Sequence, residues 1–168
     1  MIKQIKDTII HKQYFLDSAT IMFEMLINIG YDDLAIKLIR RAGIHDNSKF
    51  SMREIDCLSK ISDLQSKDDG FTNPDYTLNS AQEELIKIHW EHNRHHPEFF
   101  SNINEMQLID ILELICDWHA RSVEYNTDLL EFVTKRQRTR FHFDSVVFNS
   151  IYYICKAVVE ESNKKKSQ

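Results

Sequence analysis

Histidine is the residue type that is most locally concentrated in this sequence. Four of the eight histidines, His89, His92, His95 and His96, lie in the stretch HWEHNRHH. On a helix, His89 and His92 are one turn apart, as are His92 and His96, so each pair shares a face. Imidazoles so placed can bind one divalent ion such as zinc, iron or nickel. The competing interpretation is a solvated helix end with histidines near the last carbonyl groups.

The adjacent residues His45 and Asp46 offer a second pair of ligand types. Neighbouring side chains on a helix project about 100° apart, so both reach one ion only where a helix end or a turn frames the site. Lys49 follows closely, and a lysine there supplies a mobile positive charge for an anionic ligand. Most His-Asp dipeptides lie on the surface, and this pair alone is a weak signal.

His11 is a third candidate, early in the first expected helix. It shares a helical stripe with Phe15, Ser18 and Met22, and we expect it to face inward. A single inward histidine is more often a hydrogen-bonded core residue than a metal ligand.

Asp110 and Asp117 form a fourth constellation, because they are close to two helical turns apart and therefore share a face. That face is polar, and a solvated surface is the competing interpretation. The apolar neighbours of Asp117 favour a buried position instead. The other polar members of the face are Glu113, Arg121 and Glu124.

The elements that must position these residues are helices. The sequence has only three glycines and two prolines, too few for a protein of sheets and tight turns. Apolar residues recur every three or four positions, and Ser51 with Glu54 and Ser80 with Glu83 form capping-box patterns. We expect six helices, over about 2–29, 32–42, 51–65, 80–96, 104–132 and 144–161, with an exposed loop over 66–77.

These patterns predict an all-α protein: one compact bundle of about six helices over residues 1–162, followed by a disordered tail, 163–168. Asp144 suits the N-cap of the last helix and Gly30 the C-cap of the first. No segment resembles a repeat or a low-complexity tract.

Composition limits the partners and the compartment. The net charge of −5 gives no global basic field for a nucleic-acid backbone. No apolar run approaches the roughly 20 residues that span a bilayer, and no signal-peptide core is present. With three scattered cysteines, we expect a cytoplasmic protein, bacterial or in an infected host cell, with no membrane partner. One basic run could clamp a polyphosphate or oligonucleotide, but a solvated connection is the favoured interpretation; its residues are Lys135, Arg136, Arg138 and Arg140.

The order of the candidate ligands resembles that of the HD-domain metal-dependent phosphohydrolases, an all-helical superfamily. The stretch AGIHDNSK at 42–49 looks like the superfamily's small-apolar-His-Asp-x-x-Lys signature, and NRHHPE at 93–98 is similar to the double-histidine segment of its two-metal branch. HDNSKF, NRHHPEF and DILELICDW together also resemble a small uncharacterised bacterial and phage family at its edge. The resemblance covers about residues 11–125 and leaves out the last helix and the basic run.

The resemblance implies one or two divalent ions, among Mn, Fe, Co, Ni, Zn and Mg. The first ion would be held by His11, His45, Asp46 and Asp117, and the second by His92 and His96, with Asp46 bridging. Several histidines compete for the second position, so His95 and His89 are further candidates, and Asp110 competes with Asp117.

The same resemblance implies hydrolysis of a phosphomonoester or phosphodiester, with a nucleotide or another small phosphorylated molecule as substrate and a metal-activated water as nucleophile. Asp46 would act at the metal, while Lys49 and Arg94 would offset the phosphate charge. The same ligand order also serves di-iron oxygenases of this superfamily. Two further interpretations are a non-catalytic metal-binding regulatory module and a helical bundle without metal. The sequence leaves the substrate, the ion and the oligomeric state open.

Overall fold

A computed structural model describes residues 2–167 except for 66–79. Over the described residues the chain forms seven α-helices joined by short 3-10 and π segments, without a strand, which confirms the all-α prediction. None of the described helices is both long and apolar enough to cross a membrane. The expected loop over 66–77 lies outside the described residues.

The elements follow one another in a simple order along the chain. They are α1 (Ile2–Asn28), α2 (Asp32–Ile44), η1 (Asn47–Phe50), α3 (Met52–Gln65), α4 (Ser80–Trp90), η2 (Pro97–Phe99), η3 (Ile103–Glu105), α5 (Leu108–Tyr125), α6 (Leu129–Arg136), η4 (Gln137–Phe141) and α7 (Ser145–Lys166).

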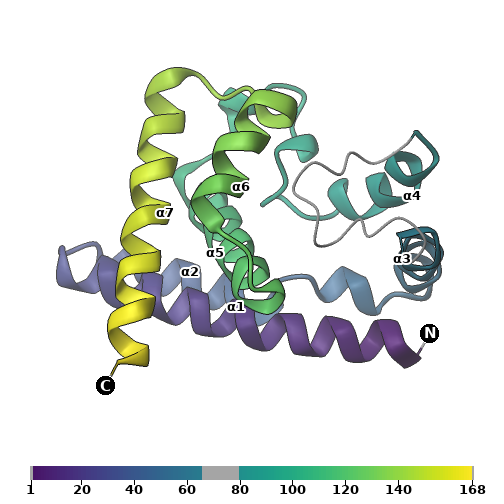
Figure 1. The fold of residues 1–168 in the computed structure, drawn as a ribbon, viewed down its shortest axis with the longest axis horizontal. Helices are drawn as coiled ribbons and strands as arrows, with labels where there is room; N and C mark the ends of the chain where they lie inside the picture. The colour runs from purple at the N-terminus through teal and green to yellow at the C-terminus, as the bar shows by residue number, and fades with distance from the viewer. Residues whose placement is uncertain (1, 66–79, 168) are drawn as a thin grey trace.

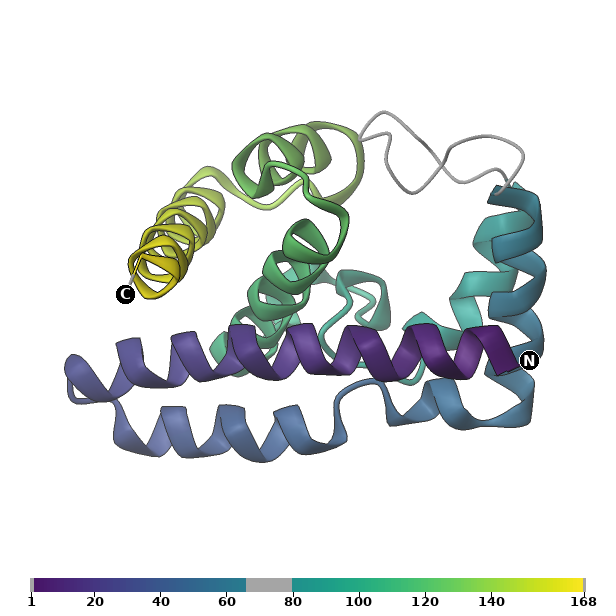
Figure 2. The ribbon, with the colours of Figure 1, turned by 60° about the horizontal axis from the view of Figure 1, so that its bottom comes forward.

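Helices α1 and α2 form an antiparallel hairpin, and η1 continues beside α1 toward its N-terminal end (Figure 2). The hairpin turns at Gly30, which has a φ of +82°. A residue with a side chain rarely adopts this left-handed conformation, whereas glycine does so at little cost. The expected C-cap at Gly30 therefore corresponds to the observed turn, and it brings the end of α2 back along α1.

Helix α5 is the central element of the fold. Leu114, Ile115, Cys116 and Ala120 on this helix are each at most 1% exposed. The helix packs against α1 and α2 on one side and contacts α6 and α7 on the other, while α3 and α4 lie at the N-terminal end of α1 (Figure 1). Several polar residues on α5, among them Asp110, Glu113 and Asp117, are consequently buried.

Several helix boundaries differ from those expected. The expected helix over 104–132 is two helices, because Asn126 adopts a left-handed φ of 53° and the Asp128 side chain caps α6 by accepting from the Glu131 amide. Helix α4 ends at Trp90 rather than near His96, and α7 continues to Lys166 through most of the expected tail.

Candidate metal centre

Four segments far apart in the sequence bring their histidines and aspartates to one buried place. His11 lies on α1, His45 and Asp46 lie at the junction of α2 and η1, and Asp117 lies on α5; these four are between 0% and 8% exposed. The fourth segment, α4 and the turns after it, supplies His89, His95 and His96.

The first half of the cluster consists of His11, His45 and Asp117. The Nε2 atom of His11 lies 2.9 Å from Asp117 Oδ1, and the Nε2 atom of His45 lies 3.8 Å from the same oxygen. One ligand atom from each residue lies within 4.8 Å of the other two, which is close enough to surround one ion.

The second half consists of His89, His95 and His96, whose ligand atoms also lie within 4.8 Å of one another. Asp46 lies between the two halves. Its Oδ2 faces the first half, 3.7 Å from His11 Nε2 and 3.5 Å from His45 Nε2. Its Oδ1 faces the second half, 3.4 Å from His89 Nε2 and 3.6 Å from His95 Nε2. This is the arrangement of a bridging carboxylate.

Five polar atoms of the cluster are buried and make no hydrogen bond of good geometry among the described residues, although two of them, His11 Nε2 and Asp117 Oδ1, lie 2.9 Å apart. They are the Nε2 atoms of His11, His45 and His95, together with Asp46 Oδ1 and Asp117 Oδ1. A buried polar atom without a partner destabilises the fold by about 1 to 3 kcal/mol, so such atoms are rare in native structures. All five are typical ligands of divalent transition metals, and a cation would satisfy them together.

Three of the imidazoles contact a glutamate through Nδ1, on the side of the ring that faces away from the centre. Glu54 Oε2 lies 2.9 Å from His89 Nδ1, Glu113 Oε1 lies 2.9 Å from His45 Nδ1, and Glu124 Oε2 lies 3.2 Å from His11 Nδ1. An ionised carboxylate only accepts, so each Nδ1 donates, and in the neutral imidazole that binds a metal each Nε2 then offers its lone pair to the centre. Metal-binding histidines commonly have this carboxylate partner.

The turn at Asp46 allows the adjacent side chains of His45 and Asp46 to face the same point. Asp46 has a left-handed φ of 56°, and His45, which ends α2, has a φ of −49° and a ψ of 131°. Lys12 holds this turn, because its Nζ donates to the His45 carbonyl at 2.5 Å and to Asn47 Oδ1 at 2.8 Å. The ring of His45 stacks on Phe15, with centroids 3.5 Å apart. Both side chains therefore face the centre without a continuous helix.

The pKa values reflect the negative charge gathered at the centre. Burial would lower the pKa of His45, but Asp46, Asp117 and Glu113 outweigh it and raise the pKa to about 9. Burial would raise the pKa of Asp46, yet His45 and Lys49 hold it well below its usual range. Burial and the neighbouring His45 lower the pKa of His95 to about 3. Asp46 is thus ionised and His95 is neutral, as metal ligands must be, whereas His45 holds a proton near neutral pH that a bound cation would displace.

His92 is the favoured ligand that the structure does not bring to the cluster. It is exposed, and its Nδ1 lies 2.6 Å from the Ile88 carbonyl. The helical spacing that pairs His92 with His96 does not apply, because α4 ends at Trp90 and the following residues form turns. His89 and His95, which the sequence favours less than His92, occupy the cluster instead.

Asp110 and Arg94 lie together, with other partners than those expected. Asp110 Oδ1 accepts from Arg41 at 2.7 Å, and its Oδ2 accepts from the Gln107 amide at 3.0 Å, as part of the capping box of α5. Arg94 Nη2 lies 3.3 Å from Asp110 Oδ2, and its guanidinium packs over Phe99 and Phe100. Ion pairing and capping account for Asp110 without a metal role.

Two other cations contact a residue of the cluster or a residue that bonds to one. Lys49 is buried and its Nζ contacts Asp46 Oδ2. Arg121 lies one turn beyond Asp117 on α5, and its Nη1 contacts Glu124 Oε2 at 3.0 Å. The side chains of Asp117 and Glu124 are each 12% exposed and that of Arg121 is 32% exposed, so this side is the open margin of the first half.

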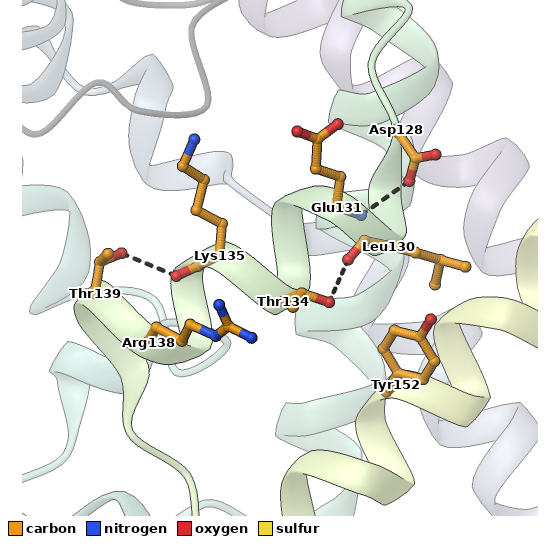
Figure 3. Close-up of a pocket in the computed structure, with 8 residues that line it drawn as sticks. All are labelled: Asp128, Leu130, Glu131, Thr134, Lys135, Arg138, Thr139 and Tyr152. Atoms are coloured by element: carbon orange, nitrogen blue, oxygen red, sulfur yellow. Dashed lines mark hydrogen bonds between the residues drawn. The ribbon is translucent and has the colours of Figure 1, made fainter.

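The basic run does not form a single clamp. Arg140 contacts Glu98 Oε1 at 2.6 Å and packs over Trp90, whereas Arg136 packs over Phe132. Lys135 and Arg138 line a separate open pocket of about 510 Å³ between α6, η4 and α7 (Figure 3). Acidic and hydroxyl side chains share this pocket, which has none of the candidate ligands in its lining.

The functional residues that sequence reasoning misses are the glutamates behind the imidazoles. In the sequence, Glu54 fits a capping box, and its amide does donate to Ser51 Oγ at 3.2 Å. Glu113 and Glu124 belong to the polar face of α5. Their spacing from Asp117 is the available signal, because residues three, four and seven apart on a helix share a face.

Comparison with known proteins adds a family but no activity. A search of curated proteins and a search of solved structures found no match. A family model described as "Family of unknown function (DUF5662)" matches residues 2–157, which include all the residues of the cluster. The chain belongs to the DUF5662 family.

Proposed function

We propose that this protein is an HD-type metal-dependent phosphohydrolase that cleaves a phosphomonoester or phosphodiester, with a nucleotide as the expected substrate. The observation that carries the proposal is the convergence of five buried ligand atoms, none with a well-formed hydrogen bond, from separate segments. The order of these ligands along the chain is the order that the resemblance implies.

The donor set fits two divalent ions. His11, His45 and Asp117 would hold the first ion with Asp46 Oδ2, and His89, His95 and His96 would hold the second with Asp46 Oδ1. Mixed imidazole and carboxylate ligands suit Mn, Fe, Co, Ni and Zn better than a site made of oxygen alone. The glutamates behind His11, His45 and His89 fix the orientation of the rings.

When bound, such ions supply a Lewis acid for a phosphoryl oxygen and lower the pKa of water toward about 7. Hydrolysis then forms a bond between the water oxygen and phosphorus and breaks the ester P–O bond, and the leaving oxygen takes up a proton. The chain's own contribution is to fix the ligands in a largely buried site and to keep Asp46 and Asp117 ionised.

The phosphate charge requires cations at the margin of the site. Arg121 suits this role, because its guanidinium carries five donors and is partly exposed next to Asp117. Lys49 contacts Asp46 and would offset charge at the bridging position. Arg94 pairs with Asp110, which is outside the cluster, whereas the partner of Arg121, Glu124, contacts the ligand His11; Arg94 is therefore a weaker candidate for phosphate contact than the sequence suggests.

The proposal is tested by a turnover screen. Protein purified without a His tag is loaded with Mn, Co, Ni, Fe, Zn or Mg and assayed with p-nitrophenyl phosphate, bis-p-nitrophenyl phosphate and a panel of nucleotides. We expect phosphate release that Asp117→Asn abolishes and that Asp56→Asn, a change to an exposed carboxylate that pairs with Lys60, leaves intact.

Two results would contradict the proposal. Turnover that requires both iron and molecular oxygen would assign the centre to the oxygenase class. Bound metal without turnover of any phosphate ester would assign it to a non-catalytic regulatory module.

A further inference from the structure

Glu113 lies between the two halves of the candidate metal centre. Its Oε1 is 2.9 Å from His45 Nδ1, in the first half, and 3.5 Å from His95 Nδ1, in the second half. The residue is 4% exposed, and the rings of His45 and His95 are close neighbours, with centroids 4.4 Å apart. One carboxylate oxygen thus faces an imidazole of each half.

Arg41 fixes the other side of this carboxylate. Its Nε lies 2.6 Å from Glu113 Oε2, and its Nη1 donates to Asp110 Oδ1 at 2.7 Å. Because Arg41 is anchored at two carboxylates of α5, it directs Glu113 Oε1 toward the histidines. Glu113 would therefore keep its orientation in the absence of either ion.

Each of the other two glutamates contacts a histidine of only one half of the centre. Glu54 on α3 contacts His89, and Glu124 on α5 contacts His11. These two contacts provide matched comparisons for Glu113, because in each case a glutamate accepts from the Nδ1 atom of a buried histidine.

We propose that Glu113 is a positioning residue shared by both metal ions, so that loss of its charge weakens the binding of both at once. The inference rests on the proposed two-metal centre and deepens it. A carboxylate that accepts the Nδ1 proton fixes the tautomer and orientation of the ring and makes Nε2 a better ligand, and its loss costs about 10- to 100-fold in metal affinity. Glu113 accepts in this way from His45 at 2.9 Å, and its charge lies 3.5 Å from His95 Nδ1, so its loss acts on a ligand of each ion.

The test is a calorimetric titration of the metal-stripped protein with Mn²⁺ in the wild type, Glu113→Gln and Glu54→Gln, with metal content after gel filtration as a second readout. We expect Glu113→Gln to raise the Kd of both ions by about 10-fold or more, and Glu54→Gln to raise the Kd of one. Circular dichroism checks that each variant is folded. If Glu113→Gln does not fold, Glu113→Asp keeps the charge but shortens the side chain, and a smaller rise in both Kd values is expected.

Arg41→Gln is the control for a merely structural role, because it removes the Arg41–Glu113 ion pair and leaves the Glu113 contacts with the histidines. We expect a smaller rise in both Kd values than in Glu113→Gln. An equal rise, or a Glu113→Gln variant that loses affinity for one ion only, overturns the inference. A wild type that binds two Mn²⁺ with an unaffected Glu113→Gln overturns this inference alone, whereas a wild type that binds no metal overturns the proposed function as well.

Discussion

His89 and His96 face each other through their ε nitrogens, with the two Nε2 atoms 3.0 Å apart. His89 Nδ1 donates to Glu54 Oε2, and the pKa of His89 is lowered by burial, so the neutral ring directs the lone pair of Nε2 at His96. Burial and the neighbouring His95 and His89 hold the pKa of His96 well below its usual range. Two neutral imidazoles that meet in this way beside Asp46 are an arrangement suited to sharing a cation.

This contact predicts different outcomes for two histidines of the same short segment. His96→Ala removes a ligand of the second half, and we expect it to lose about one equivalent of bound metal while the first half keeps its own. His92→Ala changes an exposed ring that, among the described contacts, bonds only to the Ile88 carbonyl near the end of α4, and we expect unchanged metal content. Elemental analysis after gel filtration measures both. Metal loss in His92→Ala, with His96→Ala unaffected, would reverse the assignment.

The fold could be predicted because helix periodicity and end signals act locally. Gly30 and Asp144 mark real ends, and Asp144 Oδ1 accepts from the Val146 and Val147 amides. The break at Asn126 could not be predicted in the same way, because the apolar period continues across it and only the left-handed conformation of one asparagine interrupts the helix.

Part of the candidate site could be predicted from the order of the ligands along the chain, whereas the part that depends on where a helix ends could not. His11, His45, Asp46 and Asp117 come together in the order that the resemblance implies. The choice of His92 depends on extending α4 to His96, and spacing along a helix does not show where the helix stops. The polar face of α5 likewise has two interpretations from sequence, and burial by α1 and α2 decides between them.

Arg121 and Arg94 make a second matched comparison. Arg121→Gln removes a cation at the open margin of the cluster, and we expect the KM for a phosphate ester to rise by about 10-fold or more with metal content unchanged, since a charge-assisted contact contributes roughly 1.5 to 3 kcal/mol. Arg94→Gln should leave KM within about 2-fold, because its partners are Asp110 and two phenylalanines.

The Arg121→Gln and Arg94→Gln variants are compared by two independent measurements, the KM from steady-state kinetics and the affinity for inorganic phosphate. A larger KM change in Arg94→Gln than in Arg121→Gln would show that Arg94 contacts the phosphate, as the sequence suggests. Metal loss in Arg121→Gln without a change in KM would show that Arg121 acts by holding Glu124.

The buried His119 leads us to expect that the metal-stripped protein loses stability at acidic pH. Burial and the charge of Lys166 lower the pKa of His119 to about 4, and its Nδ1 lies 2.9 Å from Ser18 Oγ. An unfolded histidine titrates near 6.5, so the unfolded state takes up the proton first as the pH falls. The stability that His119 contributes is therefore complete above about pH 6.5 and is lost between that pH and about 4.

At about pH 5 this loss amounts to roughly 2 kcal/mol of unfolding free energy. His119→Gln keeps a donor for Ser18 and has no titrating ring. Urea unfolding at about pH 7 and about pH 5 measures the free energy of unfolding, and its decrease between the two pH values should be correspondingly smaller in the variant than in the wild type. An equal loss in variant and wild type would place the acid sensitivity elsewhere.

Asp46 joins the two groups of ligands in the proposed metal centre, and Asp46→Asn is the decisive variant. Asparagine tolerates the left-handed backbone of this position, where most other side chains cost roughly 1 to 2 kcal/mol, so the change isolates the carboxylate charge. The measurement is elemental analysis of untagged, gel-filtered wild type and Asp46→Asn, with Asp56→Asn as the surface control. We expect bound divalent transition metal in the wild type and in Asp56→Asn, and its loss in a folded Asp46→Asn. A wild type without metal, or an Asp46→Asn variant that retains all of it, would show that Asp46 does not bridge a metal centre.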